Sequence, residues 1–350
     1  MKKSLIYIVS IIFFIVLCSQ VNAEVAGNCA NCHTMHNSQS GSDMATYGGT
    51  SGNNPCLTRG DCIGCHAYDT SGTDNVVNID GSLVPQVWHN GTKDLAAGNF
   101  KYIASNDNDR KGHNVAAIDP EDTAAMFGTN GAPGAENALG ITAANFSCAG
   151  KYGCHGDRAV TDEIISVKGA HHADDGTIDG MSTGTSYRFL KGVLGLENTN
   201  TPWQNISPTD HNEYKGINGP DTTSSTTTPA NATISGLCGE CHGYYHGTNT
   251  TETGGTTSPW IRHPTDFSLP SIGEYASYTT YSIVAPVART DVSAVSDTVN
   301  PGGTTDDIVM CLSCHGAHAT NFYKLMRWEY DSTTLATALE GCNVCHTSKN

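Results

Sequence analysis

The sequence predicts a fold that is mostly coil, with short α-helices and little β-structure. Only 38% of its 350 residues are hydrophobic, 15% are charged and 38 are glycines, so a continuous aliphatic core is not expected. A second observation is a five-residue pattern, Cys-x-x-Cys-His, that recurs along the chain: it occupies residues 29–33, 62–66, 238–242, 311–315 and 342–346. We therefore expect the chain to fold around the groups that these motifs hold.

Cys-x-x-Cys-His is the attachment signature of a c-type haem. Two thiols three residues apart fall on one side of a helical turn, where they can bond to two vinyl groups on one porphyrin edge. The next residue then turns its imidazole towards the iron. Five matches greatly exceed what random placement of 14 cysteines and 15 histidines would produce. Zinc ribbons and structural disulfides are the alternatives, but they give no reason for a histidine after every second cysteine.

A sixth segment, Cys148-Ala-Gly-Lys-Tyr-Gly-Cys154-His155, has five residues between its cysteines. We interpret it as a haem site with a widened loop. The alternative is a disulfide between Cys148 and Cys56, which leaves a single thioether at Cys154; otherwise Cys56 is an odd thiol. The prediction is six covalent haem c groups, attached through Cys29, Cys32, Cys62, Cys65, Cys148, Cys154, Cys238, Cys241, Cys311, Cys314, Cys342 and Cys345. The predicted proximal iron ligands are His33, His66, His155, His242, His315 and His346.

Nine further histidines could bind the opposite face of each iron. His36, His246 and His318 follow a proximal histidine by three or four residues and cannot reach around their own porphyrin, so each should serve a neighbouring haem. Methionine ligation, which would raise the potential, is the alternative for any single haem. The predicted distal ligands are His36, His113, His171, His246, His263 and His318.

The remaining distal assignments depend on neighbouring residues. Gly112 permits a close approach before His113, and Pro264 stiffens the backbone after His263. One of His171 and His172 is expected to be a ligand and the other to be free. His172 and His89 are reserves, and His211 is the weakest candidate.

Four regions follow from the motif spacing and the composition. Residues 1–23 read as a signal peptide, with a basic start, an apolar run over 5–17 and a small-residue end at 21–23; a membrane anchor is the alternative. A three-haem region over 24–194 and a polar linker or long loop over 195–236 precede a second three-haem region over 237–350. His33 and His66 lie 33 residues apart and His315 and His346 lie 31 apart, which indicates a repeated two-haem unit.

Few regular elements are expected between the motifs. Helices are predicted near 120–127, 322–330 and 334–340, and a strand or hairpin over 275–288. The formal charge of −16 argues against binding of nucleic acid or anionic lipid. Loop carboxylates are weak candidates for calcium ligands, with solvated side chains as the alternative; they are Asp107, Asp109, Asp174, Asp175 and Asp179.

Short segments around the predicted ligands resemble those of the multihaem c-type cytochromes. Within that family, they resemble the filament-forming hexahaem outer-surface cytochromes (cytochrome S) of metal-reducing bacteria. They are His33-Thr-Met-His36-Asn-Ser, Arg110-Lys-Gly-His113-Asn, Tyr187-Arg188, His242 with His246, Arg262-His263-Pro264 and His315 with His318. The resemblance implies a continuous haem chain and ligation of a haem in the next subunit by His36. The third site departs from the pattern, because Gly156-Asp157-Arg158 follows its histidine closely where another histidine would stand; His171 or His172 is the expected substitute.

The expected function is electron transfer by an exported protein of the periplasm or outer surface, without bond-making catalysis. Expected redox partners are other multihaem cytochromes or metal oxides, with polymerisation into a homopolymer; no nucleic acid and no membrane span of the mature chain are expected. The alternatives are a soluble periplasmic shuttle and a multihaem reductase with one open iron. The lysine variant of the motif that such reductases use is absent.

Overall fold

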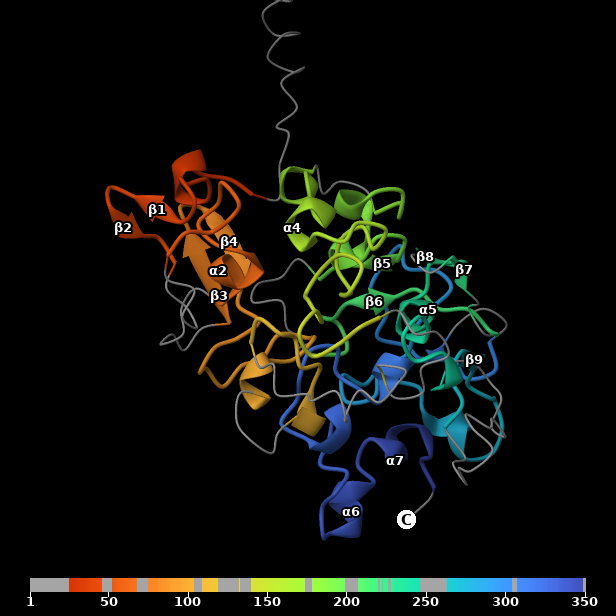
Figure 1. Ribbon diagram of the computed structural model, residues 1–350. Helices are drawn as coiled ribbons and strands as arrows, with labels where there is room; N and C mark the ends of the chain where they lie inside the picture. The colour runs from red at the N-terminus through yellow and green to blue at the C-terminus, as the bar shows by residue number, and fades with distance from the viewer. Residues whose placement is uncertain are drawn as a thin grey trace, which may run out of the picture.

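The computed structural model describes residues 25–45, 52–67, 75–103, 109–118, 132, 140–173, 178–198, 207–219, 221, 223–225, 228–245, 263–303 and 307–348. Most of these residues lie in loops, turns and bends, as the low aliphatic content predicted. The α2 region (orange) and the α6–α7 region (blue) lie at different ends of the molecule (Figure 1). The coil-rich fold class is confirmed.

The helices are short. The α-helices are α2 (Cys62–His66), α4 (Glu163–Ser166), α5 (Ile234–Gly239), α6 (Leu335–Ala338) and α7 (Cys342–Cys345). The 3-10 helices are η1 (Cys29–Asn31), η3 (Phe100–Tyr102), η4 (Asp109–Lys111), η5 (Ala170–His172), η6 (Thr183–Thr185), η7 (Tyr187–Phe189), η8 (Gly243–Tyr245), η9 (Gly273–Ser277), η10 (Cys311–Ser313) and η11 (Tyr323–Leu325). Helical turns overlap all five regular cysteine motifs.

The strands pair only as two-stranded antiparallel sheets within the described residues. The pairs are β1 (Ser38–Gln39) with β2 (Ser42–Asp43), β3 (Val76–Ile79) with β4 (Ser82–Pro85), β5 (Gly195–Leu196) with β6 (Glu213–Tyr214), β7 (Thr223–Ser225) with β8 (Thr228–Pro229), and β9 (Phe267–Ser268) with β10 (Ile308–Val309). In the β3–β4 hairpin, Asp80 (φ 50°) and Gly81 (φ 97°) form the turn. Two residues of positive φ match the twist of the flanking strands.

Among the described residues, buried apolar side chains form three separate clusters. The first includes Tyr187, Val193 and Ile308, and the second includes Leu269 and Tyr281. The third cluster centres on Phe100, Ile103, Val115 and Ala319. Small separate clusters are what a chain with little aliphatic content can build, and they leave the motifs to organise the space between them.

Several expected elements differ from the structure. Residues 275–288 form no paired strand: the 3-10 helix η9 ends at Ser277 and only single bridges at Thr280 and Ala288 follow. The helix expected over 322–330 is reduced to η11, because Lys324 and Leu325 have positive φ. The helix expected over 334–340 is present as α6, whereas the one near 120–127 lies outside the described residues.

In its described part, the segment over 195–236, which is expected to be a polar linker or long loop, includes buried residues. Strand β6 carries Glu213 and Tyr214 into the interior, and His211 is fully buried beside them. Tyr214 belongs to the same cluster as Ile308, so this segment packs onto the carboxy-terminal region.

No helix in the described part of the chain is both long enough and apolar enough to cross a bilayer. The predicted signal peptide over 1–23 lies outside the described residues.

Candidate haem attachment sites and iron ligands

In four regular motifs, the histidine donates its backbone N–H to the carbonyl of the first cysteine. The N···O distances are 2.7 Å for His33, 2.9 Å for His242, 3.2 Å for His315 and 2.9 Å for His346. The remaining regular motif, Cys62–His66, coincides with helix α2. Each turn brings the two cysteines to neighbouring positions with the imidazole directly after them, as attachment to one porphyrin edge requires.

Polar side chains begin three of these turns. Asn28, Asp61 and Thr233 accept backbone N–H bonds from the first turn of η1, α2 and α5. A side-chain oxygen at this position satisfies a backbone donor that has no partner inside the helix. In these three motifs, a polar residue ahead of the first cysteine thus helps to form the turn that carries the thiols.

The widened motif closes in the same way as the regular ones. His155 donates its backbone N–H to the carbonyl of Cys148 at 3.0 Å, and Cys154 donates to the same oxygen at 3.2 Å. The extra residues form a tight loop in which a Cβ on Gly153 would lie 2.5 Å from Ala149 N and from Ser147 O. The first cysteine and the histidine therefore meet as in a regular motif, which supports interpreting this segment as an attachment site.

All thirteen cysteines in the described residues are free thiols. The alternative disulfide between Cys56 and Cys148 is therefore not formed, and both thiols of the widened motif are available. Burial is the main cause that raises the pKa of the Cys154, Cys241, Cys314 and Cys345 thiols. Buried neutral thiols fit attachment to an apolar porphyrin edge.

The imidazoles of the motifs are oriented through Nδ1. This atom lies 3.3 Å from Leu57 O in His33, 2.9 Å from Pro85 O in His66, 2.9 Å from Arg188 O in His155 and 3.1 Å from Lys324 O in His315. A carbonyl accepts only from a protonated Nδ1, so Nε2 carries the lone pair. That tautomer is the one in which Nε2 binds a metal.

The same orientation recurs outside the motifs. Nδ1 lies 2.8 Å from a backbone carbonyl in His36 (Asn54 O), His113 (Ala317 O) and His263 (Pro264 O). In His346, a motif residue, Nδ1 instead lies 3.1 Å from Oε1 of Glu274. A carboxylate in this position makes the imidazole a stronger ligand.

Five motif histidines each face a second imidazole at nearly constant distance. The ring centroids are 6.0 Å apart for His33–His172, 6.2 Å for His66–His171, 6.1 Å for His155–His318, 6.1 Å for His242–His113 and 6.1 Å for His346–His263. A metal–nitrogen bond of about 2 Å on each side, with roughly 1 Å from Nε2 to the ring centre, separates two axial imidazoles by about 6 Å. The residues present therefore fit haem iron bound between two histidines.

Burial lowers the pKa of several imidazoles in these pairs and so favours their neutral form. It lowers the pKa of His318 to about 3, with the neighbouring His155 as the next cause. It lowers the pKa of His113 to about 4 beside His242, and that of His171 to about 4 beside His66. Because a protonated imidazole cannot bind a metal, low pKa values favour ligation at neutral pH.

The pairing matches four of the six expected distal residues: His113, His171, His263 and His318. One expectation differs, because both His171 and His172 face a motif histidine, whereas one of them was expected to be free. The 3-10 turn of η5 presents two consecutive imidazoles to two different motifs. His246 lies outside the described residues.

His36 and His315 are the two remaining members of the predicted set. Among the described residues, neither ring is stacked on or tilted against another histidine. His36 is exposed and has positive φ (56°), and its neighbour Asn37 is buried and receives the backbone N–H of Ala45 at 2.7 Å. The buried amide of Asn37 thereby anchors the turn that presents His36 to the surface.

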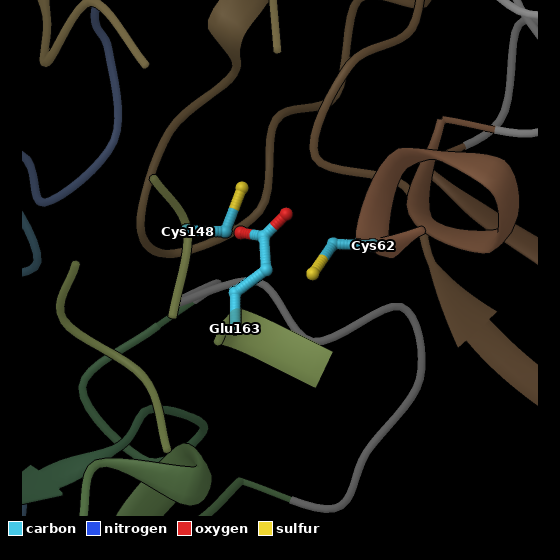
Figure 2. Close-up of side chains that lie close together, drawn as sticks. All are labelled: Cys62, Cys148 and Glu163. Carbon is cyan, nitrogen blue, oxygen red and sulfur yellow. The ribbon is translucent and has the colours of Figure 1, made fainter. Parts of the chain in front are cut away.

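The thiols of successive motifs lie beside one another. Cys62 and Cys148 share a hydrogen bond, which together with burial raises the pKa of Cys62. Figure 2 shows these two sulfurs around the carboxylate of Glu163, and the three ligand atoms lie within 4.8 Å of one another. Both cysteines belong to predicted attachment motifs, so this cluster lies where the second regular motif meets the widened one: Cys62 comes from 62–66 and Cys148 from 148–155.

Similar contacts join the other motifs. A hydrogen bond from Cys311 raises the pKa of Cys238. Burial is the main cause that raises the pKa of Cys241 and Cys314. The next cause is the neighbouring Cys154 for Cys241 and the neighbouring Cys345 for Cys314. Burial is also the main cause that raises the pKa of the Cys65 thiol, and Cys32 raises it further. Each motif therefore lies next to the motifs that precede and follow it in the sequence.

The other buried histidines have different surroundings. His211 stacks on Tyr281 at 3.6 Å, and its Nε2 lies 3.2 Å from Glu213. His89 accepts the backbone N–H of Gly91 on Nδ1, and its Nε2 lies 3.0 Å from Asn99. Neither faces a motif histidine among the described residues, in agreement with their low rank as ligands.

The calcium hypothesis remains a prediction. Asp107, Asp174 and Asp175 lie outside the described residues. Asp179 accepts hydrogen bonds from Thr185 Oγ1 at 2.6 Å and Met181 N at 2.9 Å, which act within its own loop.

No family model matches the chain. It is 26% identical over 364 residues to C-type cytochrome OmcS of Geobacter sulfurreducens, covering 89% of this chain and 81% of that protein. Two solved structures, an outer membrane cytochrome S filament and the OmcS nanowires of the same organism, cover 93% of this chain and 100% of theirs. Their identities are 18% and 17%, with TM-scores of 0.48 and 0.46. The resemblance predicted from the short segments around the ligands is thus confirmed: over most of its length, this chain is similar to the c-type cytochrome OmcS.

Proposed function

We propose that this chain is an exported multihaem c-type cytochrome that carries electrons along covalently attached haems in extracellular electron transfer. The observation that carries the proposal is the set of five histidine pairs with centroids 6.0–6.2 Å apart, each joining a motif histidine to one outside its own motif. The similarity to C-type cytochrome OmcS supports it. Bound haem supplies Fe(III)/Fe(II) cycling, and the protein sets its geometry and potential.

The proposed number of haems is six, numbered 1 to 6 in the order of their motifs. The proposed axial pairs are His33 and His172, His66 and His171, His155 and His318, His242 and His113 for haems 1 to 4, and His346 and His263 for haem 6. Haem 5 takes His315 as its proximal ligand. Backbone carbonyls at Nδ1 hold the rings of His66, His113, His155 and His263 in position.

The proposed haem order follows the sequence. Cys32 and Cys65, Cys62 and Cys148, Cys154 and Cys241, Cys238 and Cys311, and Cys314 and Cys345 are the neighbouring thiols of successive motifs. Neighbouring thiols place neighbouring porphyrin edges together. Electrons would therefore pass from one end of the chain to the other without a branch.

The proposed ligand that completes haem 5 is His36 of another copy. His36 lies exposed at the haem 1 end, and its Nδ1 lies 2.8 Å from Asn54 O, which leaves Nε2 as the nitrogen with the lone pair. His315, on the carboxy-terminal side of the chain, faces no histidine among the described residues. One bond from His36 to haem 5 of the next copy would join subunits head to tail, and such contacts build filaments unless the rotation closes a ring.

A reductase with an open iron at His315 is the second candidate, because that histidine lacks a described partner. Intact mass and electron paramagnetic resonance of the oxidised native protein separate the two. The proposal expects six haem additions and low-spin iron throughout. One equivalent of high-spin iron that binds carbon monoxide after reduction, in assembled protein, would support the reductase instead.

A further inference from the structure

Arg158 and Glu240 form a buried ion pair between two segments that are distant in sequence. Nη2 of Arg158 contacts Oε2 of Glu240, and the two side chains are 6% and 1% exposed. Nε of Arg158 is also buried and has no hydrogen-bond acceptor among the described residues. The axial pairs and attachment turns described above use neither side chain.

The pair lies at the junction of two attachment sites. Glu240 lies inside the fourth motif, between Cys238 and Cys241, and Arg158 follows His155 of the third motif by three residues. The guanidinium affects thiols on both sides: it counteracts the burial that raises the pKa of Cys154 and that of Cys241. The two charges therefore lie where haem 3 and haem 4 meet in the proposed arrangement.

Stability alone does not explain such a pair. Removing two charges from water costs several kcal/mol for each ion, and well-packed apolar residues often stabilise a protein as much or more. Buried charges do have a second effect, since the field of an ion is strongest where water is excluded. Burial and local charge are among the factors that set the reduction potential of a haem.

We propose that Arg158 and Glu240 set the reduction potentials of haems 3 and 4, and so the driving force of the central electron-transfer step. The inference rests on the proposed function. Oxidation adds one positive charge at an iron, so the guanidinium favours the reduced state and raises the potential. The carboxylate favours the oxidised state and lowers it, and the pair keeps the two effects in balance.

The test is a spectroelectrochemical titration of the full haem-loaded protein. Glu240→Gln should raise the midpoint potential of one or two of the six haems, and Arg158→Gln should lower it. The double variant, Arg158→Gln with Glu240→Gln, should lie between the single variants. Intact mass and the low-spin spectrum of each variant establish that its haems and ligands are retained.

The matched control is the neighbouring pair Asp157–Lys191. Its Nζ–Oδ2 distance is 2.6 Å, but the side chains are 29% and 30% exposed, so solvent screens their charges. Asp157→Asn and Lys191→Gln should therefore shift the midpoints less than the changes at Glu240 and Arg158.

Unchanged midpoints in Glu240→Gln with all haems retained would overturn the inference. Shifts of the same sign in both single variants would also overturn it, because they would indicate a packing effect rather than a charge effect. If Glu240→Gln does not retain its haems, Arg158→Gln and the double variant decide. A midpoint that falls in Arg158→Gln and lies higher in the double variant supports the inference, and unchanged midpoints overturn it. The proposed function fails separately, if the wild-type protein itself lacks six haems or has open irons within assemblies.

Discussion

The histidines of this chain have two kinds of surroundings, which separate predicted iron ligands from structural residues. His33, His66, His155 and His315 have Nδ1 next to a carbonyl, which leaves Nε2 available for iron. His211 has both nitrogens in contact with protein oxygens, Ser207 O and Glu213 Oε1. A histidine with both ring nitrogens engaged is a structural residue, however deeply it is buried.

The two consecutive histidines of η5 give a test of ligation at this scale. His172→Ala should convert one of the six irons, that of haem 1, from low spin to high spin, because His33 loses the imidazole 6.0 Å away. Electron paramagnetic resonance of the oxidised protein measures the change. His211→Ala, the control, should keep all irons low spin although its ring is buried. An unchanged spectrum for His172→Ala would mean that another residue ligates haem 1.

At the scale of the element, we expect the attachment turn to tolerate extra residues as long as its ends meet. The widened loop closes with His155 N on Cys148 O, as the regular motifs close between the first cysteine and the histidine. Glu163 of α4 contributes to this loop, because its carboxylate accepts backbone N–H bonds from Cys148 and Ala149. The loop can be wide in sequence and still present its thiols and imidazole in the regular arrangement.

The glycine before the second cysteine of the widened motif, Gly153, allows a test of this closure. A Cβ at position 153 would lie 2.5 Å from Ala149 N and Ser147 O, so Gly153→Ala should open the loop and reduce attachment of haem 3. Intact mass should show one haem fewer in a fraction of the molecules. Gly64 is the matched control: it precedes Cys65 in a regular motif, and an added Cβ there is 3.4 Å from its nearest neighbour. Full haem loading in Gly153→Ala would show that the loop closure is not required.

At the scale of the whole molecule, the proposed haems would take the place of a single core. Three separate apolar clusters and two-stranded sheets leave the motifs as the features that connect the chain from one end to the other. The pairs link distant parts of the sequence: His33 faces His172, and His155 faces His318. Each bound iron would act as a cross-link between segments, so haem loss should cost both folding stability and the electron path.

Assembly is tested by removing the exposed histidine. His36→Ala should leave the monomer folded with six haems, make one iron five-coordinate or water-bound, and abolish filaments. Negative-stain imaging and intact mass measure these outcomes. His172→Ala serves as the control, since it removes a ligand within one copy and should leave filaments intact. Filaments in His36→Ala, or a wild-type protein that stays monomeric with every iron bis-histidine, would contradict the intersubunit bond.

The sequence by itself determined the turns at the predicted attachment sites, because two thiols and an imidazole within a few residues form one local turn. It also indicated the coil-rich fold and, through the closing Cys154-His155, the widened motif. Only the tertiary structure paired His172 with His33 and brought Arg158 against Glu240, since these contacts depend on how distant segments pack. The expected strand over 275–288 was wrong for the same reason: a strand needs a partner along its length, and Thr280 and Ala288 find only single bridges.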